Sequence, residues 1–319
     1  MRLVGQDYKK CAKCIDVRVP RLTGPGSTVA ARAGLAVLVA TALAAGCTGS
    51  EGVHGAHGPQ EPFRPPAARA LDEYATKLRA AYAQRVAAAK RWGLKKVPLV
   101  APPPPENKPV ITFRKGFEVQ DGDDLPPIFT TIPTKDRVVF LTIDDGDEKD
   151  PAFLRMMSDL KIPYTAFLSD YLIKDDYGYF RKMRDRGVTL NNHTLHHPYL
   201  PGLSYEDQRQ EICGMQDVME EQFGRRPTVF RPPFGNYNRD TLRAAKSCGI
   251  RYAPIWDEEV YVDHWEYREW DRSLHPGDIV LTHFRGRADW NGTMPDVIRR
   301  FLKKVTDEGY AVARLEDYL

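Results

Sequence analysis

The stretch "RVVFLTIDDG", residues 137–146, predicts a buried strand and a polar site at its end. A short β-prone run bounded by a turn residue is typical of such a strand, and Gly146 permits a sharp turn after it. Asp144 and Asp145 stand side by side at the carboxyl end, where their charges repel each other unless a cation lies near. An acidic turn without a cation is the alternative for this stretch taken alone.

Six more β-prone runs follow and alternate with helical patterns. The runs are "YTAFLS" (164–169), "VTLNNHT" (188–194), "TVFRPPF" (228–234), "IRYAPIW" (250–256), "DIVLTHF" (278–284) and "YAVARL" (310–315). The helical patterns cover residues 151–160, 176–187, 204–223, 238–248 and 293–308. This alternation predicts a parallel α/β domain, best fitted by a distorted or incomplete (β/α)7 barrel. In such barrels the chemistry lies at the carboxyl ends of the strands.

The third run leads into "TLNNHTLHHPYL", residues 189–200, which holds three of the chain's eight histidines. His193 and His197 are four residues apart, so a helical turn or tight loop can direct both imidazoles at one metal ion, while His196 points elsewhere. A histidine-rich surface loop is the alternative for this pair alone. With Asp145 as third ligand, the set is a common zinc site that leaves one position open for water.

Two further strand ends carry polar side chains. "FRPPFGNYN" places Arg231 where consecutive prolines fix the backbone, and "DIVLTHF" places His283 at the end of its strand. Taken alone, the first segment is a structural turn and the second holds a structural histidine. Their coincidence at one predicted rim with Asp145 and His193 favours an active site.

In this order, "TIDDG", "HTLHH", "RPPFG" and "LTH" resemble the motifs of the polysaccharide deacetylase family, which includes the nodulation-type chitooligosaccharide deacetylases. That family consists of metal-dependent carbohydrate esterases with a distorted (β/α) barrel. The resemblance covers residues 136–319 and is specific, because four motifs coincide with four strands.

The resemblance implies roles for the motif residues. Asp145, His193 and His197 would bind the metal, and Asp144 would be the general base. Removal of an N-acetyl group needs activated water, a polarised amide carbonyl and an acid for the departing amine, and we expect His283 to be that acid.

Three residues are expected in supporting positions. Arg231 would pair with Asp144 and keep it ionised, as the family's motif arginine does. The backbone N–H of Phe234, where the family commonly has tyrosine, would help to stabilise the tetrahedral oxyanion. Leu281 would flank the acetyl methyl group.

The ligand set accepts zinc, which we expect, and also cobalt, nickel or manganese. The segment "IWDEEVYVDHWEYREW", residues 255–270, departs from the family's pattern. Either Asp257 or Asp263 is expected to tune His283, and either Trp256 or Trp265 to form a wall of the substrate groove. Packing beneath the rim is the alternative for each aromatic residue.

Residues 1–47 predict a leader. The 14-residue apolar run Ala33–Gly46 is too short to span a bilayer and precedes Cys47, an arrangement that resembles a bacterial lipoprotein signal. We therefore expect an exported protein, anchored to the membrane by a lipid on Cys47. The first 28 residues fit no signal peptide, which makes Val29 an alternative start.

The charge distribution argues against nucleic acid as a partner. The chain of 319 residues has 46 Lys and Arg and 43 Asp and Glu, a formal charge of +3. Seven of these basic and two of these acidic residues lie in residues 1–46, so the rest has 39 and 41, a charge of −2. The basic excess belongs to the leader, and no positive surface is predicted beyond it.

Between the leader and the domain, residues 48–66 predict a flexible tether and residues 67–109 an amphipathic helix followed by a proline-rich linker. The helix runs to about residue 92, and its apolar positions are Leu71, Tyr74, Ala75, Leu78, Tyr82 and Val86. We expect it to pack on the deacetylase domain, residues 110–319; a spacer or a wall contact is the alternative. Cys213 and Cys248, in separate predicted helices, are expected to be buried free thiols, with a disulfide as the alternative.

These features predict a metal-dependent N-deacetylase that acts on a cell-wall or chitin-like polysaccharide, with peptidoglycan favoured for a tethered protein. An O-acetyl esterase on a wall polymer or xylan would use the same site. A noncatalytic wall-binding lipoprotein is the contrasting class, because a fold alone does not establish catalysis. We expect a monomer.

Overall fold

The computed structural model describes residues 66–122 and 124–319, which belong to one compact unit. The helices are α1 (Pro66–Arg91), α2 (Pro151–Leu160), α3 (Asp170–Ile173), α4 (Tyr177–Arg184), α5 (Tyr205–Phe223), α6 (Arg239–Ser247), α7 (Arg287–Trp290) and α8 (Met294–Asp307), with short 3-10 turns η1 (Leu200–Gly202), η2 (Pro233–Gly235) and η3 (Leu315–Asp317). The strands are β1 (Ile128–Phe129), β2 (Val138–Asp145), β3 (Thr165–Leu168), β4 (Thr189–Asn192), β5 (Ala253–Pro254), β6 (Glu258–Val260), β7 (Trp265–Tyr267), β8 (Ile279–His283) and β9 (Ala311–Ala313). The predicted α/β class is confirmed, while the leader, Cys47 and residues 48–65 lie outside the described residues.

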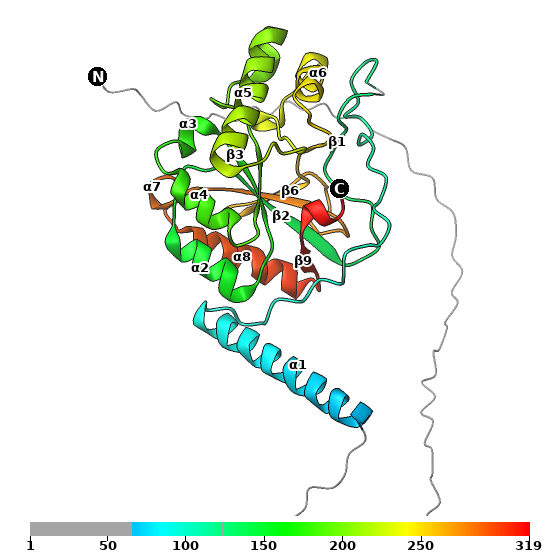
Figure 1. The fold of residues 1–319 in the computed structure, drawn as a ribbon, viewed down its shortest axis with the longest axis vertical. Helices are drawn as coiled ribbons and strands as arrows, with labels where there is room; N and C mark the ends of the chain where they lie inside the picture. Colours follow the sequence, from blue (N-terminus) through cyan, green and yellow to red (C-terminus); the bar gives the residue numbers. More distant parts are fainter. Residues whose placement is uncertain (1–65, 123) are drawn as a thin grey trace, which may run out of the picture. The chain divides into compact units, whose positions relative to one another are not determined.

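Strand β2 is the centre of the main sheet, and all eight of its residues are buried. It pairs in parallel with β8 and β3 along its carboxyl-terminal part and with β9 along its amino-terminal part. The order across the sheet is β4-β3-β2-β8-β6-β7, and only β6 and β7 are antiparallel. Figure 1 shows these strands in the middle of the domain, with α2, α4 and α8 on one side and α5 and α6 at the top.

In the described part of the chain, β1 and β5 form a separate two-stranded sheet. Isolated bridges such as Asn192 to Phe230 and Val229 to Tyr252 link the segments between the two sheets. The ladders thus form two sheets and not one continuous closed ladder, and the (β/α)7 barrel stays a prediction.

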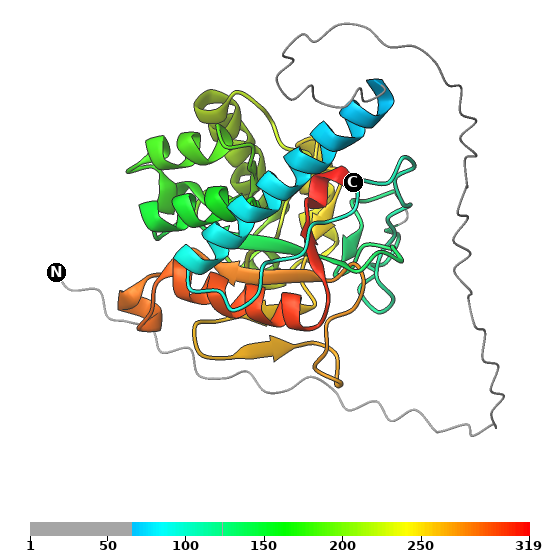
Figure 2. The ribbon, with the colours of Figure 1, turned by 90° about the horizontal axis from the view of Figure 1, so that it is seen from below.

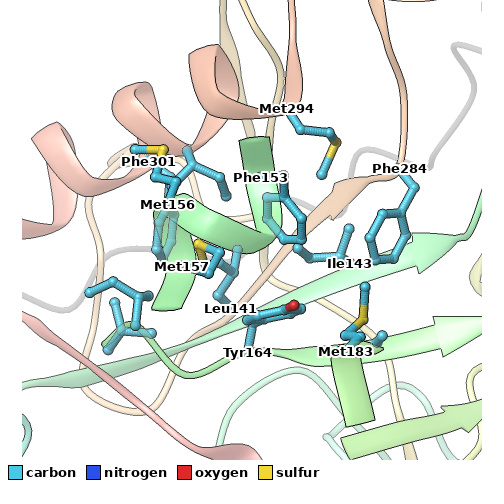
Figure 3. Close-up of a cluster of buried hydrophobic side chains, with 14 of the residues drawn as sticks. Leu141, Ile143, Phe153, Met156, Met157, Tyr164, Met183, Phe284, Met294 and Phe301 are labelled. Carbon is cyan, nitrogen blue, oxygen red and sulfur yellow. The ribbon is translucent and has the colours of Figure 1, made fainter. Parts of the chain in front are cut away.

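The largest core cluster fills the space between β2 and the helices α2 and α8. Figure 3 shows side chains from all three elements pointing toward one another, among them Leu141 and Ile143 from β2, Phe153, Met156 and Met157 from α2, and Met294 and Phe301 from α8. Burying a large apolar side chain contributes about 1.5–3 kcal/mol. This packing fixes the position of β2, whose last two residues are the aspartates of the first motif.

Local signals set the helix ends where the sequence predicts them. Helix α2 begins at Pro151, after Asp150 accepts a hydrogen bond from the Ala152 amide. Helix α6 begins with a capping box between Asn238 and Thr241. The predicted strands are less regular: the fourth run forms only isolated bridges, since Pro232 and Pro233 lack the N–H groups that a ladder needs.

The amphipathic helix is present as α1, but the expectation that it packs on the domain holds only for its last turns. With 26 residues it is about 39 Å long. Its apolar stripe is exposed, with Leu71 at 69% and Tyr82 at 59%, whereas Ala88 and Ala89 are buried in the core. Figure 1 shows the carboxyl-terminal end of the helix nearest to the domain and its amino-terminal end farther away, and Figure 2 shows the same helix in front of the domain. The remaining turns therefore have no domain surface to cover them.

The expectation of two free thiols is wrong. Cys213 of α5 and Cys248, which follows α6, form a disulfide with a Cα–Cα distance of 5.1 Å. The two helices pack side by side, so residues 35 positions apart in sequence meet. Within residues 66–122 and 124–319, none of the helices combines the length and apolar character that crossing a bilayer requires.

Candidate active site

The strand register brings the predicted site residues to one rim. In the β2–β8 ladder, Asp144 lies directly opposite His283. Across β3, Asp145 is level with Asn192, and His193 follows at the end of β4. Carboxyl ends of neighbouring parallel strands therefore meet here, as expected for a site built on strand ends.

Left-handed backbone is concentrated in the motif segments. Asp145, Thr194, His197 and Phe234 have φ angles of 81°, 72°, 56° and 61°. Non-glycine residues adopt this region rarely and at a cost, and such positions cluster at functional sites. The turns at these residues direct the following or preceding side chains into the rim.

Asp145, His193 and His197 form a group that fits a divalent metal. Each offers one ligand atom, and these atoms lie within 4.8 Å of one another. Asp145 Oδ1 is 3.4 Å from His197 Nε2 and 3.7 Å from His193 Nε2, is buried, and accepts no hydrogen bond from the described residues. His193 Nδ1 lies 2.7 Å from the Arg231 carbonyl, which fixes Nδ1 as the donor and leaves Nε2 free.

Arg285, which the sequence analysis did not single out, holds the other oxygen of Asp145. Its Nη2 is 2.7 Å from Asp145 Oδ2, and its Nη1 is 3.0 Å from Asp147 Oδ2. This contact turns Asp145 Oδ1 toward the imidazoles. No motif marks Arg285, because only the pairing of β8 with β2 brings the segment after His283 beside Asp145.

Asp144 forms a buried ion pair with Arg231. Arg231 is 0% exposed, and its Nη1 donates to Asp144 Oδ1 at 2.8 Å and to Thr142 Oγ1 at 2.9 Å. Burial raises the pKa of Asp144 to about 6, although the charge of Arg231 opposes this rise. Removing the arginine would leave a buried carboxylate without its cation.

His283 contacts Glu259, the second residue that sequence reasoning missed. Its Nδ1 is 3.2 Å from Glu259 Oε1. Burial lowers the pKa of His283, but the hydrogen bond to Glu259 and the charges of Asp145 and Glu259 outweigh burial and raise this pKa to about 9. Glu259 lies opposite Leu281 in the β6–β8 ladder, and side chains two residues apart share a face. The strand pairing would have predicted this contact, but β6 was not expected from the sequence.

The expected contact of Asp257 with His283 is wrong. The Asp257 amide donates to the Ile279 carbonyl, which places Asp257 beside the start of β8, four residues before His283. Its carboxylate pairs with Arg114 instead and lies 3.7 Å from Arg268 Nε.

Comparison with known proteins identifies the fold and its family. The polysaccharide deacetylase family model matches residues 131–253. An uncharacterized protein of Streptomyces coelicolor is 40% identical over 208 residues, which cover 64% of this chain and 83% of that protein. The chain belongs to the polysaccharide deacetylase family. The prediction of that family and of a polysaccharide deacetylase is confirmed.

Other members of the family are more distant. PdaC of Bacillus subtilis, a peptidoglycan-N-acetylmuramic acid deacetylase, is 29% identical over 201 residues, 59% of this chain. The match spans 40% of PdaC. The crystal structure of a CE4 family pseudoenzyme from Bacillus anthracis has a TM-score of 0.50 and 20% identity, and it covers 60% of this chain and 69% of that one. The fold of these deacetylases thus also occurs without catalysis.

The deacetylase residues expected on the substrate side lie around the rim. Phe234 is 45% exposed, and its ring lies 4.5 Å from that of His197. A Cβ on Gly235 would come within 3.1 Å of Trp256, so Trp256 packs on the "RPPFG" loop. Leu281 is buried on β8 beside Thr142 of β2.

The remaining candidates make contacts outside the ligand group. Trp265 stacks on Phe301 of α8, with ring centroids 6.2 Å apart, which fits the alternative of packing beneath the rim. Asp263 is exposed and contacts His264. His196 points away from the ligand group, as predicted, and its Nδ1 is 2.8 Å from Glu211 Oε1.

Proposed function

We propose that this chain is a metal-dependent hydrolase that removes N-acetyl groups from a cell-wall polysaccharide, with peptidoglycan as the preferred substrate. One observation carries the proposal: Asp144 and His283 face each other across two strands, beside the Asp145, His193 and His197 group. A base, an acid and a metal-ligand set on one rim are the parts that amide hydrolysis needs.

Asp145, His193 and His197 hold the metal, and zinc suits this mixed oxygen and nitrogen set. When bound, the metal polarises the amide carbonyl and lowers the pKa of water. Contacts within the chain orient the ligands before the metal binds. Arg285 orients Asp145, and the Arg231 carbonyl fixes the tautomer of His193.

Asp144 is the general base. Arg231 holds Asp144 Oδ1, so Oδ2, which lies 3.6 Å from His193 Nε2, is the oxygen that faces the ligand group. As the water oxygen bonds to the carbonyl carbon, Asp144 takes the proton from water. Since the pKa of Asp144 is about 6, the carboxylate is ionised at neutral pH.

His283 is the general acid. Glu259 keeps the imidazole protonated, so His283 can give a proton to the amide nitrogen as the C–N bond breaks. The products are acetate and a free amine on the sugar. The two residues thus divide the proton transfers between the two sides of the scissile bond.

Three residues shape the place of the acetyl group. The backbone N–H of Phe234 donates no hydrogen bond within the described part of the chain, so it is available to the developing oxyanion. Leu281 lies beside the acetyl methyl group, and Trp256 forms part of the groove wall.

The relatives and the amino-terminal segment support peptidoglycan as the substrate. PdaC is named for its action on peptidoglycan, and residues 1–47 carry the pattern of an export signal that ends at the lipidated Cys47. With residues 48–66 as tether and 67–109 as helix and linker, the deacetylase domain of residues 110–319 is held outside the membrane, within reach of the wall. The protein acts as a monomer.

Acetate release from the full-length protein tests the proposal. The protein is stripped with a chelator and supplied with single divalent ions, and acetate is followed from peptidoglycan and from chitin oligomers. His193→Ala should abolish release, while His196→Ala, which removes a neighbouring histidine outside the ligand group, should keep it.

Metal-dependent release that is faster from peptidoglycan would support the proposal. Release from O-acetylated xylan alone would replace it with an esterase. If metal binds and no acetylated glycan is hydrolysed, the chain is a binding protein like the pseudoenzyme that shares its fold.

A further inference from the structure

A second group of metal-ligand side chains lies at the other end of β8. Glu258 of β6, and His275 and Asp278, which precede β8, each offer one ligand atom, and these atoms lie within 4.8 Å of one another. At the usual rise of a strand, the five steps from Asp278 to His283 span about 16 Å. This group is therefore separate from the candidate active site.

The two carboxylates of this group are buried without sufficient donors. Glu258 is 1% exposed and Asp278 is 0% exposed. Asp278 Oδ2 accepts the His275 amide, but Asp278 Oδ1 and Glu258 Oε2 accept no hydrogen bond from the described residues. A buried carboxylate oxygen without a donor is costly, and neighbouring carboxylates repel each other. A proton or a cation must compensate them.

The basic side chains near this group are engaged elsewhere. Arg114 pairs with Asp257 and Glu269, and Lys304 donates to Glu308. In the part of the chain that the structure describes, Glu258 makes no ion pair with Lys or Arg. His275, whose Nδ1 lies 3.4 Å from Asp278 Oδ2, is therefore the basic side chain that contacts the pair, and among the described residues no ion pair compensates Glu258.

Burial, the charge of Asp278 and a hydrogen bond between the two carboxyl groups raise the pKa of Glu258, and burial also raises the pKa of Asp278. Without a cation, one of the two groups would thus bind a proton at neutral pH. A divalent cation would reverse this effect, because it stabilises both ionised forms.

The orientation of His275 distinguishes this group from a simple acidic cluster. His275 Nε2 lies 3.1 Å from Asp271 Oδ2, and its Nδ1 lies 3.4 Å from Asp278 Oδ2. A carboxylate on one ring nitrogen is the usual arrangement for a histidine that offers the other nitrogen to a metal. The partly exposed His275 and the buried Asp278 line an open depression on the surface together with Arg114, Asp257 and Asp271, so solvent reaches the group at His275.

We propose that Glu258, His275 and Asp278 bind a second divalent cation of the zinc class. Two carboxylates and one imidazole are ligands that such ions accept. The ion would join β6, the segment before β8 and the start of β8. Its role is structural, since it lies far from the reacting groups, and the inference does not depend on the proposed function.

Metal content of the full-length protein tests this inference. After loading with zinc and removal of unbound ions, the wild type should hold about two zinc ions per chain. His193→Ala/His197→Ala removes the ligands at the rim and should leave about one. Adding His275→Ala should remove the last ion, whereas adding His264→Ala should not. Both histidines are surface residues that contact an aspartate, so the second substitution is a matched control.

Loss of all zinc in the His193→Ala/His197→Ala protein would overturn the inference, as would equal zinc in the His275→Ala and His264→Ala additions. If only the rim site fails to bind metal, the result differs: the wild type would hold one zinc ion, and this ion would depend on His275 and not on His193. Glu258→Gln supplies a second readout. Zinc should raise the thermal unfolding midpoint of the His193→Ala/His197→Ala protein. It should not raise the midpoint of the same protein that also carries Glu258→Gln. A zinc-independent midpoint in both proteins would mean that the carboxylates share a proton.

Discussion

The carboxylate of Glu259 determines the charge of His283 at neutral pH. Burial lowers the pKa of the imidazole, and only the contact with Glu259 and the nearby carboxylate charges raise it to about 9. A general acid must be protonated to act, so the activity is expected to fall as pH rises through this pKa.

Glu259→Gln should lower the pKa of His283 and move the basic limb of the pH profile to lower pH, by about one unit or more. The measurement is kcat/KM for acetate release as a function of pH. Glu266→Gln, on the neighbouring strand β7 and exposed, is the control and should leave the profile unchanged. An unchanged basic limb in Glu259→Gln would show that Glu259 does not set the charge of His283.

Gly146 is required for a steric reason beside the ligand Asp145. Its φ is 102°, and an added Cβ would lie 2.4 Å from Ile173 Cγ2. Gly187 has a similar positive φ of 84° but no neighbour within 4 Å of an added Cβ. An alanine at Gly187 therefore meets only the cost of a positive φ, whereas an alanine at Gly146 meets this cost and a steric contact.

Gly187→Ala should lower the free energy of unfolding by about 1 kcal/mol, and Gly146→Ala by about 2–3 kcal/mol. Gly146→Ala should also weaken metal binding, because the turn that positions Asp145 must shift. Denaturant unfolding and metal titration of both variants measure these effects. Equal costs in the two variants would contradict the steric argument.

At the scale of the elements, α1 contributes to stability through one end only. Ala89→Glu should lower the free energy of unfolding by about 2 kcal/mol or more, because it buries a charge in the core. Leu78→Glu, on the exposed stripe of the same helix, should change it by less than about 0.5 kcal/mol. Denaturant unfolding of the two variants decides the point: a large cost for Leu78→Glu would mean that the stripe is covered in solution.

The Cys213–Cys248 disulfide fixes α5 against the end of α6. For two cysteines separated by 35 positions in the sequence, the chain-entropy estimate of its contribution is about 3–4 kcal/mol. Cys213→Ser/Cys248→Ser should lose about this much free energy of unfolding and keep metal-dependent acetate release, since neither cysteine lies on the rim. Wild type in a reducing agent should match the variant, and a thiol-insensitive unfolding curve would contradict the assignment.

The elements differ in how well the sequence predicts them. Helix α2 is predicted at its observed bounds, because Asp150 and Pro151 mark its start and the apolar spacing is regular. Strands β1, β6 and β7 are two or three residues long, too short for a period-two pattern. Strand β6 pairs with the longer β8, whereas β1 pairs with the two-residue β5 and β7 with β6, so pairing and not a local pattern defines these strands.

For the whole molecule, the sequence predicts the site where it lies in motifs and misses it where only pairing creates it. Asp144, Asp145, His193, His197, Arg231 and His283 meet at one rim as expected, since each ends a strand-like run. Glu259 and Arg285 lie outside any motif, and their contacts depend on the register of β8 with its neighbours. Asp257 and Asp263 were the expected alternatives for the partner of His283, because the sequence contains no information on that register.

In the proposed reaction, Asp144 takes a proton from water beside a metal that other residues would hold. The most direct test is the turnover of Asp144→Asn at full metal occupancy, with acetate release and metal content measured on the same sample. We expect acetate release by Asp144→Asn to fall by at least about 100-fold, which is the contribution of a general base. Metal content should stay at the wild-type level. Wild-type turnover in Asp144→Asn with its metal bound would contradict the account.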